Sequence, residues 1–329
     1  MSAAPVLEVR DLTVEFTTDR GTVRPVEGVD LTLRAGEMLG LVGESGSGKS
    51  ATSLAITGLT EYTGGRIVSG SVRLGDVDML ALTAKGRAAV LGRDVGMVFQ
   101  QPRRSLNPTM PVGHQIAETV RRHRGVSRRE AWDRAVQMLE RVRIPDAARR
   151  AREYPFSFSG GMAQRVMIAM ALACEPKVLI ADEPTTALDA TVQATVMELL
   201  RELQHDLGVA VLLITHDLGV AWGSCDRVAV MYCGQVVEEG PVRDLLTAPE
   251  HPYTQGLLRA TPHRGMRGRL TPIAGSVPSP ANLPAGCRFH PRCPRFTAGM
   301  CDVTEPRLEV RGHGRSDRCV HPEQRVVSR

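Results

Sequence analysis

The sequence predicts an α/β protein with a mainly parallel sheet, an antiparallel edge sheet, a helical lobe and a small cysteine-containing extension at the carboxyl end. Short apolar runs typical of buried strands alternate with segments of helical periodicity. A glycine-rich string follows the first of these runs. The chain has 329 residues, 42% of them hydrophobic. That is enough for about two domains with a sizeable core.

The first elements follow from local patterns. Apolar residues largely alternate over residues 7–16, which predicts a strand of an antiparallel edge sheet. Met38–Val42 is a short apolar strand. Residues 50–59 have helical spacing, with Gly58 near the end. The order strand, glycine-rich string, helix is therefore expected over residues 38–59.

The glycine-rich string fits the phosphate-binding pattern GxxxxGKS at residues 43–50. A chance match anywhere in this chain has a probability of roughly 0.3%. Glycines let backbone N–H groups turn towards phosphate oxygens, Lys49 reaches the β and γ phosphates, and the Ser50 hydroxyl is a Mg²⁺ ligand. The predicted nucleotide contacts are Gly43, Ser45, Gly46, Gly48, Lys49 and Ser50.

A second apolar run, residues 178–181, precedes Asp182 and Glu183 and predicts a buried parallel strand with acids at its end. Asp182 would hold Mg²⁺, and Glu183 would orient and polarise the attacking water. Two acids after a strand are weak evidence alone. Together with the phosphate-binding string they predict nucleotide hydrolysis.

The rest of the chain continues the alternation. An apolar stripe predicts a helix over residues 192–207 that ends before Gly208, followed by a buried strand over residues 209–214. Residues 101–175 are rich in helical patterns and arginine. Residues 271–284 contain four prolines and predict an extended connection. No internal repeat is visible.

Charge and hydropathy limit the partners. The net charge is +5, with a local +7 in both residues 121–152 and residues 264–329. Such patches could bind nucleic acid or acidic lipid headgroups, but neither resembles a nucleic-acid module, so solvated faces are expected. No apolar run approaches the ~20 residues of a membrane span, and the amino terminus lacks the order of a secretory signal. We therefore expect a cytoplasmic location and no nucleic-acid partner.

Between the two nucleotide motifs lie residues 158–162, Phe-Ser-Gly-Gly-Met, followed by a helical run. Here the chain resembles the nucleotide-binding subunits of ATP-binding-cassette (ABC) transporters, whose P-loop ATPase fold carries a signature written LSGGQ. Gln100 resembles the Q-loop, residues 187–189 the D-loop and His216 the switch histidine. The resemblance covers residues 6 to about 260.

The resemblance implies roles for these residues. Gln100 would contact Mg²⁺ and act in hydrolysis with Glu183 and His216. Asp189 and the signature residues Ser159, Gly160 and Gly161 would bind the ATP held by a partner subunit, and Phe16 would stack on adenine. Met162 replaces the glutamine of the general signature; this removes a polar contact but keeps the serine and both glycines.

Residues 158–162, 166–172, 181–189 and 251–258 are similar to the first of the two ATPase subunits of oligopeptide and dipeptide importers. The resemblance implies a different second ATPase subunit, two transmembrane permease subunits and, indirectly, an extracytoplasmic substrate-binding protein. It places the chain peripherally on the cytoplasmic face of the membrane. Nickel and glutathione importers remain alternatives.

Two readings outside transport were also considered. Chromosome and repair ATPases insert long coiled coils into the cassette, whereas only 58 residues separate Gln100 from Ser159, and translation ATPases usually carry two cassettes. A metal-binding module with a vestigial ATP site is opposed by the intact Lys49, Asp182 and His216.

Four of the seven cysteines crowd into the last 43 residues, with intervals of five, seven and seventeen residues: Cys287, Cys293, Cys301 and Cys319. In a cytosolic chain such clustering favours metal over disulfides. Tight CxxC pairs typical of zinc knuckles are absent. The resemblance to importer ATPases extends through these cysteines and implies a [4Fe–4S] cluster, with zinc or free thiols as alternatives. His290, His313 and His321 are expected at the surface.

These features predict three parts: a nucleotide-binding core of residues 1–100 and 176–245, a helical signature lobe of residues 101–175, and an extension of residues 246–329 with the proline-rich link and the cysteines.

Overall fold

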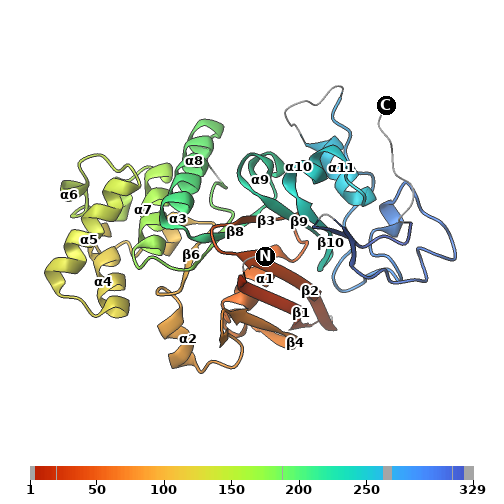
Figure 1. The fold of residues 1–329 in the computed structure, drawn as a ribbon, viewed down its shortest axis with the longest axis horizontal. Helices are drawn as coiled ribbons and strands as arrows, with labels where there is room; N and C mark the ends of the chain where they lie inside the picture. Colours follow the sequence, from red (N-terminus) through yellow and green to blue (C-terminus); the bar gives the residue numbers. More distant parts are fainter. Residues whose placement is uncertain (1–3, 20, 187, 262–268, 313, 322–329) are drawn as a thin grey trace. The chain divides into compact units, whose positions relative to one another are not determined.

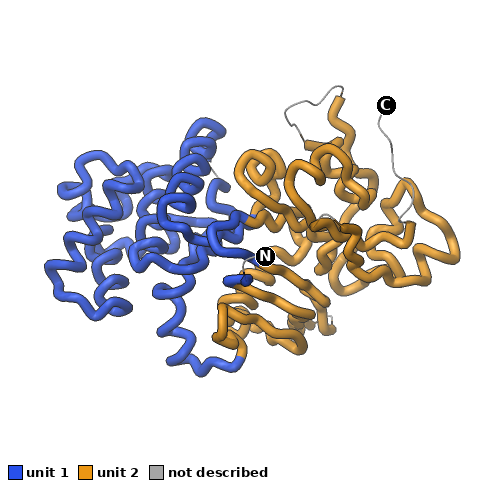
Figure 2. The backbone as a smooth tube through the Cα atoms, viewed as in Figure 1, with its two compact units in different colours: residues 1–6, 33–38, 81–214 blue, residues 7–32, 39–80, 215–329 orange. Residues whose placement is uncertain are grey.

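The computed structural model describes residues 4–19, 21–186, 188–261, 269–312 and 314–321. The chain divides into two compact units (Figure 2). Unit 1 comprises residues 1–6, 33–38 and 81–214, and unit 2 comprises residues 7–32, 39–80 and 215–329. The predicted division into core, lobe and extension stays a prediction, although the lobe lies wholly within unit 1.

Unit 1 contains three neighbouring parallel strands in the order β6 (Val95–Val98), β7 (Val178–Asp182) and β8 (Ala210–Thr215). Nearly every residue of these strands is buried. Runs of Val, Leu and Ile without polar alternation are what a strand needs when helices or loops cover both faces. The predicted buried strand of residues 178–182 is confirmed, and the strand expected at residue 209 begins one residue later.

Residues 101–175 are mainly helical, as their sequence patterns predict (Figure 1). In α5, Ser127 caps the amino end and forms a reciprocal capping box with Glu130, which satisfies two backbone N–H groups that the helix itself cannot pair. The helices of unit 1 are α2 (Ala84–Val90), α3 (Pro102–Ser105), α4 (Val112–Arg124), α5 (Arg128–Arg141), α6 (Ala147–Arg150), α7 (Gly160–Leu172) and α8 (Ala190–Leu207), with a 3-10 turn at Pro155–Ser157.

Unit 2 contains most of a four-stranded sheet in the order β2 (Gly21–Arg34), β1 (Pro5–Thr18), β4 (Gly65–Leu74) and β5 (Val77–Asp78). The strands β1 and β4 are antiparallel, with Leu7 opposite Leu74. This confirms the antiparallel sheet expected from the alternation at residues 7–16.

A second group of strands in unit 2 pairs β3 (Met38–Val42) in parallel with β9 (Arg227–Tyr232), and β9 with the antiparallel β10 (Gln235–Pro241). The extension adds β12 (Arg315–Asp317) and β11 (Glu309–Gly312) beyond β10. The helices are α1 (Lys49–Ile56), α9 (Leu218–Ser224), α10 (Val242–Thr247) and α11 (Pro252–Ala260), with 3-10 turns at Thr60–Thr63 and His290–Arg292.

Residues 271–284 contain no helix or strand, as the prolines predict. Beyond them the segment that carries Phe289 packs on β9 and α11 through a buried aromatic cluster. The ring centres of Tyr232 and Tyr253 are 4.5 Å apart, and each lies 5.3 Å from that of Phe289. Within the described residues, no helix is both long and apolar enough to cross a membrane.

Candidate nucleotide site

The phosphate loop, residues 43–50, connects β3 to α1 as predicted. Gly43 has φ 156° and Gly48 has φ 107°. A Cβ at Gly43 would lie 2.1 Å from the Met231 carbonyl oxygen, and one at Gly48 would lie 2.0 Å from that of Pro25. Both positions therefore require glycine, since no side chain fits between the loop and the neighbouring backbone.

Lys49 is the buried cation of the loop, with only 5% of its surface exposed. Its Nζ donates to the carbonyl oxygens of Gly43 at 2.9 Å and Glu44 at 3.0 Å, and lies 3.4 Å from Ser47 Oγ. These bonds pair the ammonium group within the loop. Ser45, Gly46 and Ser50 are exposed, so a phosphate group can reach the loop from solvent.

The acidic strand end lies in unit 1. Asp182 is the last residue of β7 and is 9% exposed. Glu183 has φ 48°, a left-handed conformation that is rare for residues other than glycine and often found at functional sites. Its Oε2 accepts from Gln100 Nε2 at 2.7 Å and from Thr186 Oγ1 at 2.8 Å. The structure thus brings Gln100 and Glu183 together and holds the carboxylate in one orientation.

The signature residues begin α7. Ser159 is the N-cap, and its Oγ accepts from the Met162 N–H at 3.3 Å. A Cβ on Gly161 would lie 2.5 Å from Val192 Cγ1, so α7 and α8 approach closely only with glycine there. Asp189 Oδ1 caps α8 by accepting from Thr191 N and Val192 N at 3.1 and 3.0 Å. The predicted residues Ser159, Gly161 and Asp189 therefore lie at the amino ends of α7 and α8.

The other predicted nucleotide contacts lie in unit 2. Phe16 is partly exposed on β1, and its ring lies over Gly65, where a Cβ would come within 2.6 Å. His216 is exposed in the segment between β8 and α9. Asp217 fixes the next turn, because its Oδ1 caps α9 by accepting from Val220 N at 3.2 Å. Ala187 of the expected D-loop lies outside the described residues.

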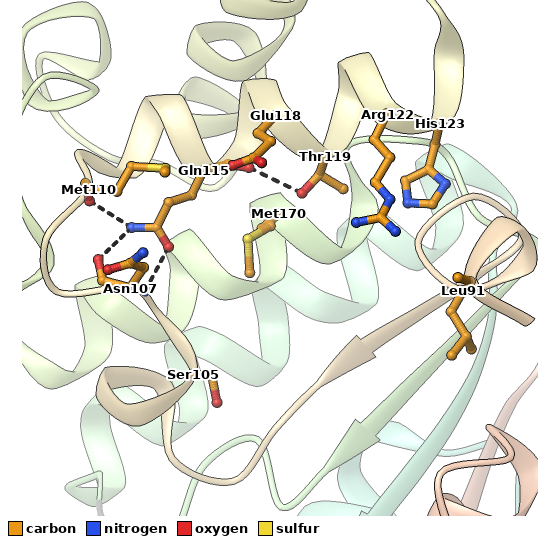
Figure 3. A pocket seen from close by; sticks show the side chains of 11 residues that line it. Leu91, Ser105, Asn107, Met110, Gln115, Glu118, Thr119, Arg122, His123 and Met170 are labelled. Atoms are coloured by element: carbon orange, nitrogen blue, oxygen red, sulfur yellow. Dashed lines mark hydrogen bonds between the residues drawn. The ribbon is translucent and has the colours of Figure 1, made fainter. Parts of the chain in front are cut away.

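A pocket of about 420 Å³ opens in the lobe, between the segment after Gln100 and α4 (Figure 3). Gln115 shapes one end: its Nε2 donates to the carbonyls of Asn107 and Met110, and its Oε1 accepts from Asn107 N. At the other end, burial and the charge of Arg122 lower the pKa of His123. One end of the pocket is thus lined by the hydrogen-bonded amide of Gln115, and the other end by Arg122 and His123.

The four cysteines of the extension are free thiols in unit 2. Backbone N–H groups lie within hydrogen-bonding distance of three sulfurs, Arg295 N to Cys293, Thr297 N to Cys301 and His321 N to Cys319, at 3.4 to 3.5 Å. Burial, with smaller contributions from the charges of the other three cysteines, raises the pKa of Cys287 to about 11. The four sulfurs are therefore near enough to interact electrostatically.

This arrangement does not by itself form a metal centre. Within the described part of the chain, no three Cys, His, Asp or Glu side chains are placed together as ligands for an ion. The predicted iron–sulfur cluster is thus not supported by the geometry. His321, expected at the surface, is partly exposed, and its Nε2 lies 3.4 Å from Cys301 Sγ. His290 stacks on Phe296, and His313 lies outside the described residues.

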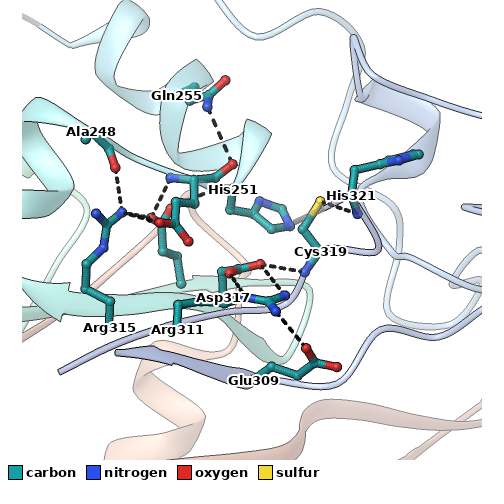
Figure 4. A network of polar contacts seen from close by, with 11 residues as sticks. Ala248, His251, Gln255, Glu309, Arg311, Arg315, Asp317, Cys319 and His321 are labelled. Carbon is teal, nitrogen blue, oxygen red and sulfur yellow. Dashed lines mark hydrogen bonds and ion pairs between the residues drawn. The ribbon is translucent and has the colours of Figure 1, made fainter. Parts of the chain in front are cut away.

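Figure 4 shows how the end of the extension is anchored. Asp317 on β12 is 1% exposed and accepts from Arg311 Nε at 2.5 Å and from Cys319 N at 3.1 Å. Arg315 donates to the Ala248 carbonyl at 2.5 Å and pairs with the buried Glu238 at 3.6 Å. Cys319 is therefore positioned by a polar network that reaches β10.

Sequence reasoning missed the residues that join the extension to the phosphate loop. Tyr253 Oη accepts from the Glu44 N–H at 2.9 Å, and Arg292 forms an ion pair with the Glu44 carboxylate at 2.7 Å. Glu44 occupies an unspecified position of the GxxxxGKS pattern. No local signal could have marked it.

Comparison with known proteins gives two family matches. Residues 26–186 match the ABC transporter family, and residues 237–301 match the carboxyl-terminal region of oligopeptide/dipeptide transporters. The oligopeptide transport ATP-binding protein AppD of Bacillus subtilis is 49% identical over 95% of this chain and 96% of its own length. A putative peptide import ATP-binding protein of Brucella abortus is 50% identical over 97% of this chain and 96% of its own length.

Solved structures agree. The dimeric ATP-binding cassette MJ0796 in a post-hydrolysis state with ADP and phosphate gives a TM-score of 0.64 at 29% identity, covering 72% of this chain and 99% of that one. The cassette cbiO1 of Clostridium perfringens gives 0.63 at 28% identity, covering 74% and 90%.

The class is therefore that of the ATP-binding cassettes, in agreement with the phosphate loop, the acidic strand end and the signature helix. Within this class, the chain belongs to the family of ATP-binding subunits of oligopeptide and dipeptide ABC importers.

Proposed function

We propose that this chain hydrolyses ATP to drive uptake of peptides through a membrane permease. The observation that carries the proposal is the phosphate loop with its buried Lys49, in a chain about half identical to peptide-import ATP-binding proteins along almost its whole length. Gly43 and Gly48 let the loop fit against the neighbouring backbone, which keeps it in the closed form that can hold a phosphate group.

In this proposal unit 2 binds the nucleotide. The amides of Gly46 and Gly48 and the Lys49 ammonium group hold the phosphates, and Phe16 stacks on adenine. Ser50, Asp182 and Gln100 would supply the oxygen ligands that Mg²⁺ prefers, and charge neutralisation on the phosphates is the chemistry that such an ion would add. Ser50 is exposed at the start of α1, and Asp182 is the last residue of the buried strand β7, so both residue types and their local settings fit the ion.

Unit 1 supplies the groups for hydrolysis. Glu183 orients and polarises the attacking water, and the hydrogen bond from Gln100 keeps its carboxylate in position. His216 of unit 2 contacts the developing charge. Because Gln100 lies at the start of the lobe, a change at its side chain can be passed to the lobe and the permease.

The proposed assembly contains a second, different ATPase subunit, two transmembrane permease subunits and, indirectly, an extracytoplasmic substrate-binding protein. The chain would act peripherally on the cytoplasmic face of the membrane, and nucleic acid is not a partner. The family match at residues 237–301 supports this assignment. Ser159, Gly160, Gly161 and Asp189 would contribute to the ATP site of the second subunit.

Co-reconstitution of the chain with its permeases, partner ATPase and binding protein tests this function. Di- and oligopeptides should stimulate ATP hydrolysis and accumulate inside vesicles. Stimulation by nickel or glutathione alone would replace peptide import by one of the alternative substrates. ATP hydrolysis without transport of any solute would contradict an importer.

We also propose that Cys287, Cys293, Cys301 and Cys319 hold a [4Fe–4S] cluster that orders the extension. The proposal is supported by the sequence, in which four of the seven cysteines fall within the last 43 residues, and it requires the thiols to move closer together than the described residues place them. The extension has few large apolar residues around which to fold without such a centre. Protein purified without oxygen should be brown and lose its colour in Cys293→Ser. A colourless protein with one zinc ion would replace the cluster by zinc, and neither metal would refute both.

A further inference from the structure

A bidentate ion pair between Arg292 and Glu44 connects the extension to the phosphate loop. Arg292 Nη1 and Nη2 donate to the two carboxylate oxygens of Glu44 at 2.7 and 3.1 Å. The side chain of Arg292 is only 3% exposed, whereas that of Glu44 is 29% exposed. Bidentate arginine–carboxylate pairs fix both distance and orientation. This contact therefore holds one residue of the loop in a defined place.

The backbone of Glu44 is fixed as well. Its N–H donates to Tyr253 Oη at 2.9 Å, and its carbonyl accepts from Lys49 Nζ at 3.0 Å. The carboxylate, amide and carbonyl of one residue thus connect the extension to the lysine of the loop. Movement of Glu44 would shift the atom on which the Lys49 ammonium group rests.

Arg292 is itself firmly placed. Its Nε donates to the Ala274 carbonyl at 3.0 Å, and its Nη1 lies 3.4 Å from Tyr232 Oη. In the same turn, Arg288 donates to the Cys233 carbonyl at 2.5 Å and pairs with Glu27. Arg288 directly follows Cys287, and Arg292 directly precedes Cys293. Both arginines therefore connect the cysteine segment to the nucleotide-binding part of unit 2.

Glu44 also poses an electrostatic problem that Arg292 solves. A carboxylate in a loop built for phosphate groups disfavours a triphosphate, and a paired arginine cancels most of that charge. We infer that Arg292 is a positioning residue for ATP binding, which neutralises and orients Glu44 so that nucleotide affinity depends on the docked extension. The inference rests on the proposed nucleotide site.

Titration of the purified full-length chain with a fluorescent ATP analogue tests it. Arg292→Ala should raise Kd about tenfold, because an unpaired Glu44 then remains beside the phosphates. Arg292→Lys should raise it less, since lysine keeps the charge but not the bidentate geometry. In the assembled transporter, KM for ATP should rise while kcat at saturating ATP stays within about twofold of the unchanged protein.

The double variant Glu44→Gln/Arg292→Ala should recover most of the affinity, since the repelling charge is gone. Arg295→Ala is the matched control: this arginine lies in the same segment but donates to Gln255 at 3.2 Å, and its removal should leave Kd unchanged. An Arg292→Ala protein that binds like the unchanged one would overturn the inference, as would a double variant as weak as the single one.

If Arg292→Ala does not fold, Glu44→Gln alone decides. It leaves Arg292 as an uncompensated cation beside the loop, so affinity should be equal or higher, and a tenfold loss would contradict the electrostatic role. Failure of the unchanged chain to bind the analogue at all would instead refute the nucleotide site itself.

Discussion

Two glycine-rich helix starts in this chain are built very differently. The phosphate loop carries three glycines with positive φ, a buried lysine and a fixed neighbour in the extension. The signature segment before α7 has exposed Ser159 and glycines in ordinary conformations, with no lysine or arginine among residues 158–162. Both offer helix N–H groups to an anion. Only the first supplies its own cation.

The difference teaches which site can bind nucleotide alone. A closed loop with a buried ammonium group compensates phosphate charge before any partner arrives. The exposed helix start at the signature offers only the helix dipole, which solvent screens and which attracts an anion less than a buried lysine does. It therefore suits a phosphate group that is already bound to Mg²⁺ and to the lysine of another phosphate loop. The signature is therefore expected to matter only in the assembled transporter, and the predictions below test this contrast.

The largest effect is expected at Glu183. Glu183→Gln keeps an oxygen that can accept from Gln100 and Thr186 but removes the negative charge that polarises water. Turnover of the assembled transporter should fall about 100- to 10,000-fold, while ATP binding is retained at both helix starts. Single-turnover hydrolysis of radiolabelled ATP measures it. A loss smaller than tenfold would remove Glu183 from this role.

Lys49→Ala should weaken nucleotide binding by the isolated chain about 100-fold, because it removes the only positive charge among residues 43–50 that attracts the phosphates. Lys85→Ala, which changes an exposed lysine of α2, is the control and should have no effect. Equilibrium titration with a fluorescent nucleotide checks both. Equal affinity of the two variants would mean that the loop does not bind phosphate.

Ser159→Arg should separate the two helix starts. The isolated chain should bind ATP within about twofold of the unchanged protein, whereas turnover of the assembled transporter should fall about tenfold, since bulk at the α7 start blocks the partner's nucleotide. Steady-state ATPase assays with and without the partner measure this. A purified transporter with two copies of this chain and no other ATPase would contradict the proposed heteromer.

The strands, loops and helix ends around the two glycine-rich segments could be predicted from the sequence. The strands β3 and β7, the loop between residues 43 and 50 and the end of α8 at Gly208 follow from patterns of a few residues. Helix α1 ends at Ile56, and the left-handed Gly58 (φ 67°) follows its C-cap, in agreement with the stop expected near Gly58. The left-handed Glu183 could not be foreseen, since nothing in its own residue type favours that conformation.

Long-range contacts lay beyond sequence reasoning for a different reason. Arg292 and Glu44 are 248 positions apart, and each has a common residue type in an unremarkable local context. The pocket beside α4 is equally a product of packing. Hydrophobic periodicity predicts which face of an element is buried but not which distant side chain it meets.

The smallest predicted effect concerns the contact between β10 and the extension, where Glu238 accepts from the N–H groups of Glu250 and His251. Burial raises the pKa of Glu238 to about 7, and burial lowers the pKa of His251 to about 4. The usual pKa values of these side chains are 4.5 and 6.5. Glu238 therefore lowers the stability of the fold as pH rises towards 7, because its carboxyl ionises more readily in the unfolded chain. His251 lowers the stability as pH falls towards 4, because its ring is protonated more readily in the unfolded chain. Between pH 4.5 and 6.5 the two contributions oppose each other.

Glu238→Gln removes the first contribution and leaves the second. On acidification from pH 6.5 to 4.5, the variant should therefore lose about 1 to 3 kcal/mol of stability relative to the unchanged protein. Thermal unfolding across this pH range measures the difference. Parallel pH profiles for the two proteins would show that Glu238 is already ionised when the protein is folded.

The ion pair between Glu44 and Arg292 also sets an order of events during synthesis. The phosphate loop leaves the ribosome early, but its arginine partner follows 248 positions later. At bacterial-type elongation rates of about 5 to 20 residues per second, the loop waits roughly 12 to 50 s for that partner. A nascent chain therefore forms this contact only after residue 292 has been synthesised, and a chain truncated before that residue would present the loop without the ion pair at Glu44.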